Sequence, residues 1–302
     1  MKIELNELSE VKGIGKKTIN RVKRYVKGKE KMKEKRDTSL RVTELQTNAI
    51  HCGDNIKVMR EKIPDESIDL TVTSPPYDNL RDYEGEWDFN FKGLAQELYR
   101  VTKKGGVVVW VVNDATVDGS ETGNSFKQAL YFKKIGFNLH DTMIYAKENP
   151  MPLTHNRYEQ QFEFMFVFSK NRLKTFNPIK KENKCAGEIN SGTFRQNGNK
   201  LLPKNKIGKI KNKSYKNNIW YYKVGRNMTT KDKFAFEHPA MFPEKLAEDH
   251  IKSWSNEGDV VLDPMCGSGT TLKMANKLNR EYIGIDISQK YCDIAKKRLK
   301  TD

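Results

Sequence analysis

The residue types that could do chemistry gather in two short stretches of the 302-residue chain, "TSPPY" at residues 73–77 and "DPMCGSGTT" at residues 263–271. The first stretch places Pro75, Pro76 and Tyr77 closely after "SIDLTV", an apolar run that is typical of a buried strand. Because proline fixes the backbone and cannot pair within a sheet, the strand must end there at a rigid turn. A rigid turn with no further role is the simpler interpretation of this stretch.

The second stretch predicts a loop that binds a nucleotide-like cofactor. Residues 260–262 are typical of a short buried strand, Gly267 and Gly269 of a tight turn, and residues 270–278 of a helix. Glycine lets a ligand approach the backbone, as in the strand, loop and helix units that bind nucleotides. The next strand, "YIGID", ends at Asp286, near the spacing of ~20 residues at which a carboxylate accepts hydrogen bonds from ribose hydroxyls. NAD is disfavoured because no third glycine follows, and a P-loop is excluded because no Gly-Lys-Ser/Thr follows.

Together with "HPAMFPEKLAEDHI" at residues 238–251, the two stretches resemble the β-class of S-adenosylmethionine-dependent DNA amino-methyltransferases. The resemblance covers about residues 48–300 and consists of three separated motifs in the order of that class. It implies an α/β fold with a doubly wound, Rossmann-like sheet in circularly permuted order. The cofactor loop comes last in the chain, so the sheet closes only if "AIHCGD" packs near "YIGIDIS".

The resemblance implies which residues hold the cofactor. In the family the Gly-rich loop binds the methionine end, a carboxylate holds the ribose, and the "HPAMFP" segment closes over the methionine end. The corresponding residues here, with the first placed toward the adenine, are Asp54, His238, Pro239, Phe242, Pro243, Asp263, Met265, Cys266, Gly267, Gly269, Thr270, Thr271, Asp286 and Ile287. Methionine at position 265 departs from the phenylalanine that is commoner in the family.

The resemblance also assigns "TSPPY" to the target base. An exocyclic amino group is conjugated with its ring and is a poor nucleophile, so the base must be flipped out of the duplex and its nitrogen held near tetrahedral geometry. In the family the serine side chain and the first proline carbonyl accept from the amino group, and the tyrosine ring stacks on the base. The catalytic residues implied here are Ser74, Pro75, Pro76 and Tyr77, with the methyl group moving in one in-line step.

The first residue of the motif bears on which base is methylated. Family members with aspartate there mostly methylate adenine N6, whereas serine mostly accompanies cytosine N4. Ser74 therefore favours cytosine N4, with adenine N6 as the alternative. A C5-cytosine enzyme is excluded because it needs a nucleophilic cysteine, usually after proline, and the four cysteines follow His51, Lys184, Met265 and Tyr291. A DNA-binding module without enzymatic activity is a further alternative, against which the intact cofactor loop argues.

Most of the net charge of +16 lies between residues 170 and 233, where 18 Lys and Arg face three Asp and Glu. The segment is rich in Asn, Gly and Lys without apolar period, which predicts long loops, followed by a strand at "NIWYYKVG". A solvated insert is the plain interpretation, and a DNA-binding target-recognition region held over the catalytic cleft is the functional one. The DNA-binding residues predicted here are Lys204, Lys206, Lys209, Lys211 and Lys213.

A second basic segment occupies residues 1–37, with 13 Lys and Arg against six acids. Within it, "VKGIGKKTINRVKRYV" resembles the helix-hairpin-helix element, whose glycine turn offers backbone N–H groups to a phosphate at a helix N-terminus. The DNA-binding residues implied are Gly13, Gly15, Lys16 and Lys17. A helical hairpin with a glycine turn and no ligand is the alternative.

These features predict four parts: a basic segment and linker (1–37), a catalytic half (38–169), a target-recognition region (170–233) and a cofactor-binding half (234–302). The four cysteines lack a paired CxxC spacing, so we predict neither a metal site nor structural disulfides. Without a membrane span or a secretory signal, the expected location is cytoplasmic. The expected partner is double-stranded DNA. The sequence leaves open a cognate restriction endonuclease and the choice between monomer and homodimer.

Overall fold

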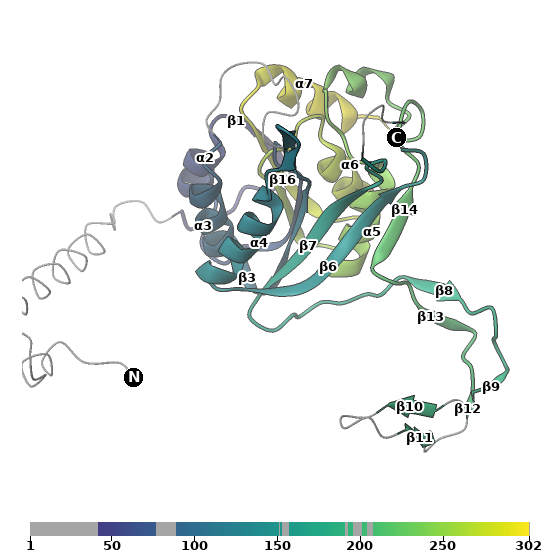
Figure 1. Ribbon diagram of the computed structural model, residues 1–302. Coiled ribbons are helices and arrows are strands. Elements are labelled where there is room, and N and C mark those ends of the chain that lie inside the picture. Colours follow the sequence, from purple (N-terminus) through teal and green to yellow (C-terminus); the bar gives the residue numbers. More distant parts are fainter. Residues whose placement is uncertain are drawn as a thin grey trace, which may run out of the picture. The chain divides into compact units, whose positions relative to one another are not determined.

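A computed structural model describes residues 42–76, 89–150, 152, 157–190, 193–195, 201–203 and 208–301. The chain divides into two compact units, Met1–Thr43 and Glu44–Asp302, and the elements described below belong to the second unit (Figure 1). Several residues predicted to act in the site or on DNA lie outside the described residues: Gly13, Gly15, Lys16, Lys17, Tyr77, Lys204 and Lys206.

Eight strands form the central sheet, in the order β1-β16-β15-β2-β3-β7-β6-β14. Their bounds are β1 Ala49–Cys52, β2 Ile68–Thr73, β3 Thr102–Val112, β6 Phe137–Lys147, β7 Phe162–Lys170, β14 Ile219–Tyr222, β15 Val260–Asp263 and β16 Glu281–Asp286. β7 runs antiparallel to both of its neighbours, and the other neighbouring strands are parallel. The sheet is therefore of the open, mostly parallel kind that helices cover on both faces.

The pairing of β1 with β16 confirms the circularly permuted order. Cys52 at the end of β1 lies opposite Asp286 at the end of β16, and β15 lies between β16 and β2. The first strand of the sheet in the chain thus closes against the last. The predicted α/β, doubly wound, Rossmann-like fold is confirmed.

Helices cover both faces of this sheet (Figure 1). Their bounds are α2 Asn55–Lys62, α3 Phe91–Val101, α4 Asn124–Ile135, α5 Glu244–Trp254, α6 Thr270–Lys277 and α7 Gln289–Arg298, with a 3-10 helix, η2, at Lys233–Glu237. A short hairpin, β4 Thr116–Val117 and β5 Ser120–Glu121, follows β3. None of the helices within the described residues is long and apolar enough to cross a membrane.

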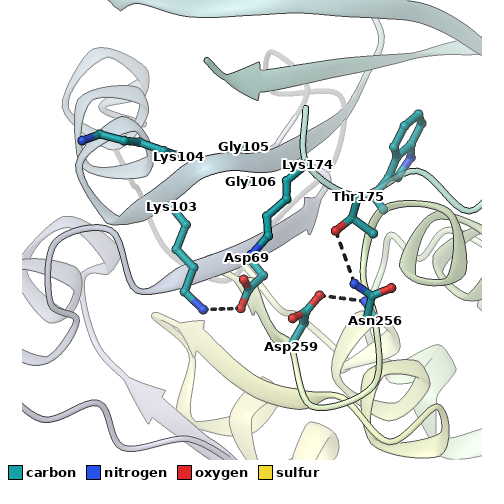
Figure 2. A pocket seen from close by; sticks show the side chains of 10 residues that line it. Asp69, Lys103, Lys104, Gly105, Gly106, Lys174, Thr175, Asn256 and Asp259 are labelled. Atoms are coloured by element: carbon teal, nitrogen blue, oxygen red, sulfur yellow. Dashed lines mark hydrogen bonds and ion pairs between the residues drawn. The ribbon is translucent and has the colours of Figure 1, made fainter. Parts of the chain in front are cut away.

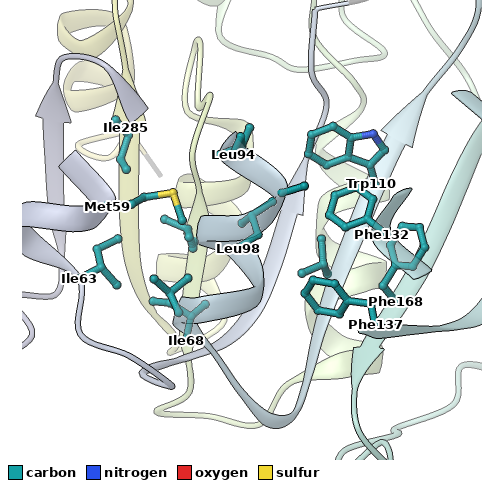
Figure 3. Close-up of a cluster of buried hydrophobic side chains, with 14 of the residues drawn as sticks. Met59, Ile63, Ile68, Leu94, Leu98, Trp110, Phe132, Phe137, Phe168 and Ile285 are labelled. Carbon is teal, nitrogen blue, oxygen red and sulfur yellow. The ribbon is translucent and has the colours of Figure 1, made fainter. Parts of the chain in front are cut away.

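Two hydrophobic cores lie on the two faces, and β3 contributes to both. Trp110 packs with Leu98 of α3 and Phe132 of α4 in the first core (Figure 3), whereas Val109 and its alternate neighbours pack in the second core with α5 and α6. Successive residues of a strand point to opposite faces, so a strand buried on both sides must be apolar throughout. This explains the uninterrupted run "VVVWVV".

Within the segment predicted as long loops, the described residues form three short antiparallel strand pairs instead. Its strands are β8 Lys180–Glu182, β9 Ile189–Asn190, β10 Thr193–Arg195, β11 Leu201–Pro203, β12 Gly208–Lys209 and β13 Lys213–Tyr215. The pairs β8–β13, β9–β12 and β10–β11 are nested in sequence, and we call residues 180–215 the basic arm (Figure 1). The described side chains of the basic arm are mostly exposed, so its sequence shows no alternation of apolar and polar residues. The prediction failed because backbone hydrogen bonds, which leave no such pattern, hold its strands together.

The base of the basic arm lies at the edge of the sheet where the parallel strands begin. Phe176, just before the arm, stacks on Trp254 at a ring distance of 5.3 Å. Trp254 in turn lines a pocket with Asp69 and Lys103, which lie near the starts of β2 and β3. The expectation that residues 170–233 lie over the catalytic cleft is therefore wrong for the base of the arm. The antiparallel β7 is the reason, because it returns the chain to the far edge.

Candidate active site

The two stretches with chemical potential meet at the edge of the sheet where the parallel strands end. Thr73 Oγ1 at the end of β2 donates a hydrogen bond of 2.7 Å to Asp263 Oδ1 at the end of β15, and both side chains are buried. Thr271 Oγ1, at the start of α6, donates to the Val72 carbonyl at 3.0 Å. Ligands of open α/β sheets bind outside the carboxyl ends of the strands. This edge is therefore the candidate site.

The target stretch leaves β2 at this edge. Ser74 and Pro76 are partly buried and Pro75 is buried, directly after the hydrogen-bonded Thr73. The hydrogen bond fixes the strand end on which the stretch begins. Ser74 and Pro75 are thus held beside the Gly-rich loop, although the two stretches are far apart in the chain.

Asp263 supports the Gly-rich loop from beneath. It is 3% exposed, and its Oδ1 also accepts from the Met265 backbone N–H at 3.2 Å. Burial raises the pKa of Asp263 to about 6, although hydrogen bonds from Thr73 and Met265 act in the opposite direction. The side chain predicted to line the cofactor is placed to hold the loop and the target stretch together.

The raised pKa of Asp263 predicts a pH-dependent stability. A carboxyl group whose pKa is higher in the folded state stabilises the fold when protonated and loses that contribution as the pH rises. Between pH ~4 and pH ~6 the free energy of unfolding should therefore fall by up to about 3 kcal/mol from this group, and level off above. Urea unfolding across this range should show the fall in the wild type and a smaller fall in Asp263→Asn. Parallel profiles of the two proteins would contradict the burial effect.

Asp286 joins the loop to the end of β16. Its Oδ2 accepts from the Gly267 backbone N–H at 2.8 Å and its Oδ1 from the Ser288 N–H at 2.9 Å. Burial raises the pKa of Asp286 against these hydrogen bonds. The Ile287 backbone N–H also bonds this carboxylate, so three of the about four lone-pair positions of an ionised carboxylate have backbone partners, and the partly buried Asp286 can still accept from a ligand hydroxyl. Ile287 follows with its side chain 40% exposed beside it.

His238 covers the Gly-rich loop. Gly267 has a left-handed backbone with φ 48°, and a Cβ there would lie 2.6 Å from His238 Nε2. The imidazole stands edge-on to Tyr291 at a ring distance of 4.4 Å, and its Nδ1 accepts from the Ala240 N–H at 3.2 Å. The "HPAMFP" segment and the loop are thus brought together, as the sequence predicts.

The other predicted cofactor residues take varied places. Asp54 is exposed at the end of β1, where its carboxylate caps α2 by accepting from the Lys57 N–H at 2.8 Å. Gly269 approaches α7 so closely that a Cβ would lie 2.7 Å from the Ala295 Cβ. Pro239 is exposed, whereas the remaining predicted residues are partly or fully buried around the loop and the start of α5: Phe242, Pro243, Met265, Cys266, Thr270 and Thr271. Burial raises the pKa of the Cys266 thiol well above its usual range, so no nucleophilic thiolate is held there.

Sequence reasoning missed a buried cluster of charges behind the loop. Arg298 is fully buried and contacts Asp232 and Glu244, and Lys273 is 7% exposed. The one signal in the sequence was Lys273, a charged residue in the first turn of α6, where the neighbouring residues are buried. The acidic partners lie too far away in the sequence for any spacing rule to connect them.

A polar pocket lies at the opposite edge of the sheet from the candidate site (Figure 2). Its lining residues are Asp69, Lys103, Lys104, Gly105, Gly106, Lys174, Thr175, Trp254, Asn256 and Asp259. Lys103 Nζ pairs with Asp69 Oδ2 at 2.6 Å, and Asp259 accepts from the Asn256 N–H at 2.7 Å. These groups satisfy one another, and the strand starts are not where such sheets bind ligands. We assign no function to this pocket.

Comparison with known proteins gives matches over most of the chain. A family model described as DNA methylase matches residues 68–297. The orphan methyltransferase M.BamHII of Bacillus amyloliquefaciens is 57% identical over 245 residues, which are 80% of this chain and 92% of that protein. The type II methyltransferase M.BglII of Bacillus subtilis is 26% identical over 260 residues, 82% of this chain and 68% of that protein.

Two solved structures resemble the fold. The PvuII DNA methyltransferase, titled cytosine-N4-specific, matches with a TM-score of 0.63 and 18% identity, over 85% of this chain and 88% of that chain. The complex of M1.HpyAVI with SAM matches with a TM-score of 0.54 and 24% identity, over 83% of this chain and 98% of that chain. At these identities the likeness shows the fold alone.

Proposed function

This chain belongs to the DNA methylase family whose members modify exocyclic amino groups, and from that premise we propose that it transfers a methyl group from S-adenosylmethionine to N4 of cytosine in DNA. The observation that carries the proposal is the buried hydrogen bond between Thr73 and Asp263. It joins the strand end that bears Ser74 to the strand end that bears the Gly-rich loop. A flipped base and a methyl donor bound at these two places would be neighbours.

The residues at the loop fit S-adenosylmethionine. When bound, this cofactor supplies a methyl group on a positively charged sulfur. Asp286 keeps acceptor capacity for a ribose hydroxyl beyond its backbone hydrogen bonds. The left-handed Gly267 leaves its backbone open to a ligand where any side chain would meet His238. His238 and Pro239 would cover the methionine end, and Asp54 and Ile287 would border the adenine.

Ser74 and Pro75 would orient the target amino group. The Ser74 hydroxyl and the Pro75 carbonyl would each accept a hydrogen bond from the target amino group, which turns the nitrogen lone pair toward the methyl group. The nitrogen would form its new bond to the methyl group as the bond from sulfur to methyl breaks, and the cationic nitrogen would then give one proton to solvent water. Because the hydrogen bonds from Thr73 and Thr271 tie this strand end to the loop, proximity and orientation supply most of the acceleration.

Serine at the first position of the motif supports cytosine over adenine. The likeness to a cytosine-N4-specific structure adds nothing to this choice at 18% identity. Methylation-sensitive sequencing of DNA from cells that express the protein tests it, because it reports base and site together. We expect N4-methylcytosine within one defined sequence. N6-methyladenine alone would overturn the cytosine assignment and leave the enzyme class intact.

Double-stranded DNA is the proposed partner, and the basic arm is its main electrostatic contact. Lys209 ends β12, Lys213 begins β13 and Lys211 lies between these two strands, and all three residues are exposed. A two-stranded ribbon fits the major groove of DNA. Residues 223–233 follow β14 at the carboxyl edge of the sheet, which is the edge of the candidate site. We therefore propose that these residues, and not the basic arm, contact the base edges that specify the sequence.

Replacing the arm lysines should weaken DNA binding through lost phosphate contacts. For Lys209, Lys211 and Lys213 changed together to Gln, the slope of log affinity against log salt should flatten by about 2.7, at 0.9 for each lost phosphate contact. Titration of a fluorescent duplex over a salt series measures this slope. The control changes Lys127, Lys133 and Lys134 of α4 to Gln, an equal loss of charge that should leave the slope unchanged. Equal slopes in the two variants would refute the arm as a DNA contact.

Deleting residues 1–37 should lower DNA affinity without changing the methylated sequence. The segment lies outside the described residues, so the prediction rests on its basic composition and its helix-hairpin-helix resemblance. Phosphate contacts position a protein on DNA, whereas base contacts specify the site. The Michaelis constant for DNA should rise and the salt dependence should flatten. A truncated enzyme that methylated a relaxed or different sequence would instead make this segment part of the recognition apparatus.

A further inference from the structure

The guanidinium of Arg298 forms a buried hub behind the Gly-rich loop. Its side chain is 0% exposed, at the end of α7. Its nitrogens donate hydrogen bonds to two carboxylates, to two oxygens of one loop serine and to the hydroxyls of two threonines. The acceptors are Asp232 Oδ2 at 3.0 Å, Glu244 Oε1 at 2.6 Å, Ser268 O at 3.1 Å, Ser268 Oγ at 3.0 Å, Thr270 Oγ1 at 2.9 Å and Thr230 Oγ1 at 3.2 Å. Every donor group of the fork therefore has a partner.

The hub is electrically balanced. Lys273 Nζ of α6 lies 2.9 Å from Asp232 Oδ2 and 3.6 Å from Glu244 Oε1, so two cations face two acids. Burial acts to raise the pKa of Asp232, but hydrogen bonds and charge from Lys273 and Arg298 outweigh it, and the pKa is lowered. Asp232 is therefore ionised at neutral pH. Buried ion pairs add little net stability over apolar residues of similar size, so this cluster points to a role in fixing position.

The hub joins two segments that must meet for the site to form. Ser268 and Thr270 belong to the Gly-rich loop, whereas Thr230, Asp232 and Glu244 begin and end the segment that carries His238. That segment is also tied to itself, because Thr230 Oγ1 donates to Glu244 Oε1 at 2.7 Å. The segment that places His238 over Gly267 is thus joined to the loop through Arg298.

We propose that Arg298 is a positioning residue, which sets the closure of residues 230–244 over the Gly-rich loop and thereby the affinity for S-adenosylmethionine. The inference rests on the proposed function and adds a residue that the sequence motifs do not include. Arginine suits the role because its planar fork reaches acids and loop oxygens at fixed angles, whereas lysine offers one point charge. A lysine at position 298 would thus keep the acids paired with a positive charge but would lose the hydrogen bonds to the loop.

The test is a double-mutant cycle on the dissociation constant of S-adenosylmethionine, measured by calorimetry. Arg298→Lys should raise this constant about tenfold in the wild-type background. In the His238→Ala background the same change should raise it by a clearly smaller factor, since the imidazole that Arg298 positions is gone and only Pro239 and the loop remain to be displaced. If Arg298→Lys acted only through a general loss of stability, it would raise the dissociation constant by the same factor in both backgrounds. Asp232→Asn, which weakens the hub while keeping its shape, should give a smaller change in the same direction, and replaces Arg298→Lys if that variant does not fold.

Arg100→Lys is the matched control. Arg100 also makes several hydrogen bonds, to the Met59 and Ile63 carbonyls and to Asp65 and Glu97, but on the helices α2 and α3. It should leave the dissociation constant unchanged. The inference is overturned if Arg298→Lys binds S-adenosylmethionine as the wild type does, or if its effect persists in full without His238. Failure of the wild type to bind S-adenosylmethionine would overturn the proposed function instead.

Discussion

Gly267→Asp should abolish measurable binding of S-adenosylmethionine, with a loss in affinity of about a hundredfold or more, equivalent to about 3 kcal/mol. A Cβ at this position would lie 2.6 Å from His238 Nε2, so the imidazole or the loop must move. The new carboxylate would also adjoin Asp286, which accepts from the backbone N–H of this residue. Asp263→Ala should weaken binding too, because it releases both the loop at Met265 and the strand end at Thr73.

Calorimetry with S-adenosylmethionine and a duplex-binding assay together check this result. DNA affinity should stay largely intact, because the basic arm is far from the Gly-rich loop in the sequence and its base lies at the opposite edge of the sheet. Gly258→Asp is the matched control: Gly258 also has a left-handed backbone, with φ 80°, but nothing lies within 4 Å of a Cβ there. Normal cofactor affinity in Gly267→Asp would overturn the assignment of the loop.

Tyr77→Ala and Pro75→Ala should show the converse pattern, with normal cofactor binding and a large loss of methyl transfer. Stacking on a base is worth ~1–3 kcal/mol, so Tyr77→Ala should cost up to about a hundredfold in the single-turnover rate. Pro75→Ala frees the backbone that holds an acceptor carbonyl, and a displacement of ~1 Å at a reacting group can cost about a hundredfold. Ser74→Ala removes the other acceptor and should lose rate in the same way.

Single-turnover kinetics with saturating cofactor separate this loss from a binding defect. Tyr77→Phe is the matched control, since it keeps the ring that would stack and removes only the hydroxyl. It should retain most of the rate. If Tyr77→Ala transferred methyl groups as fast as Tyr77→Phe, the stacking role would be wrong.

The elements that motifs and periodicity mark were predictable. The Gly-rich turn before α6 and the doubly buried β3 follow from local pattern, whereas the pairing of β1 with β16 was predicted from the motif order of the family. The meeting of His238 with Gly267 was predictable only through the family resemblance. Each of these depends on short-range sequence signals or on a motif order that is specific to one class.

What could not be predicted depends on contacts between distant residues. The basic arm lacks an apolar period because its described side chains are mostly exposed, so only backbone pairing reveals its strands. Its base lies at the far edge of the sheet because β7 is antiparallel, and strand direction is not written in a local pattern. Asp263 and Arg298 show the same limit, since their partners Thr73 and Asp232 are 190 and 66 residues away.

The central claim is that this edge of the sheet delivers a methyl group to an exocyclic amino group of a DNA base. The most direct measurement incubates the purified protein with duplex DNA and S-adenosylmethionine labelled in its methyl group, then digests the DNA and separates the nucleosides. We predict label in N4-methyldeoxycytidine, and its loss in Ser74→Ala. Label in 5-methyldeoxycytidine, or no label from a protein that binds both DNA and S-adenosylmethionine, would contradict the account.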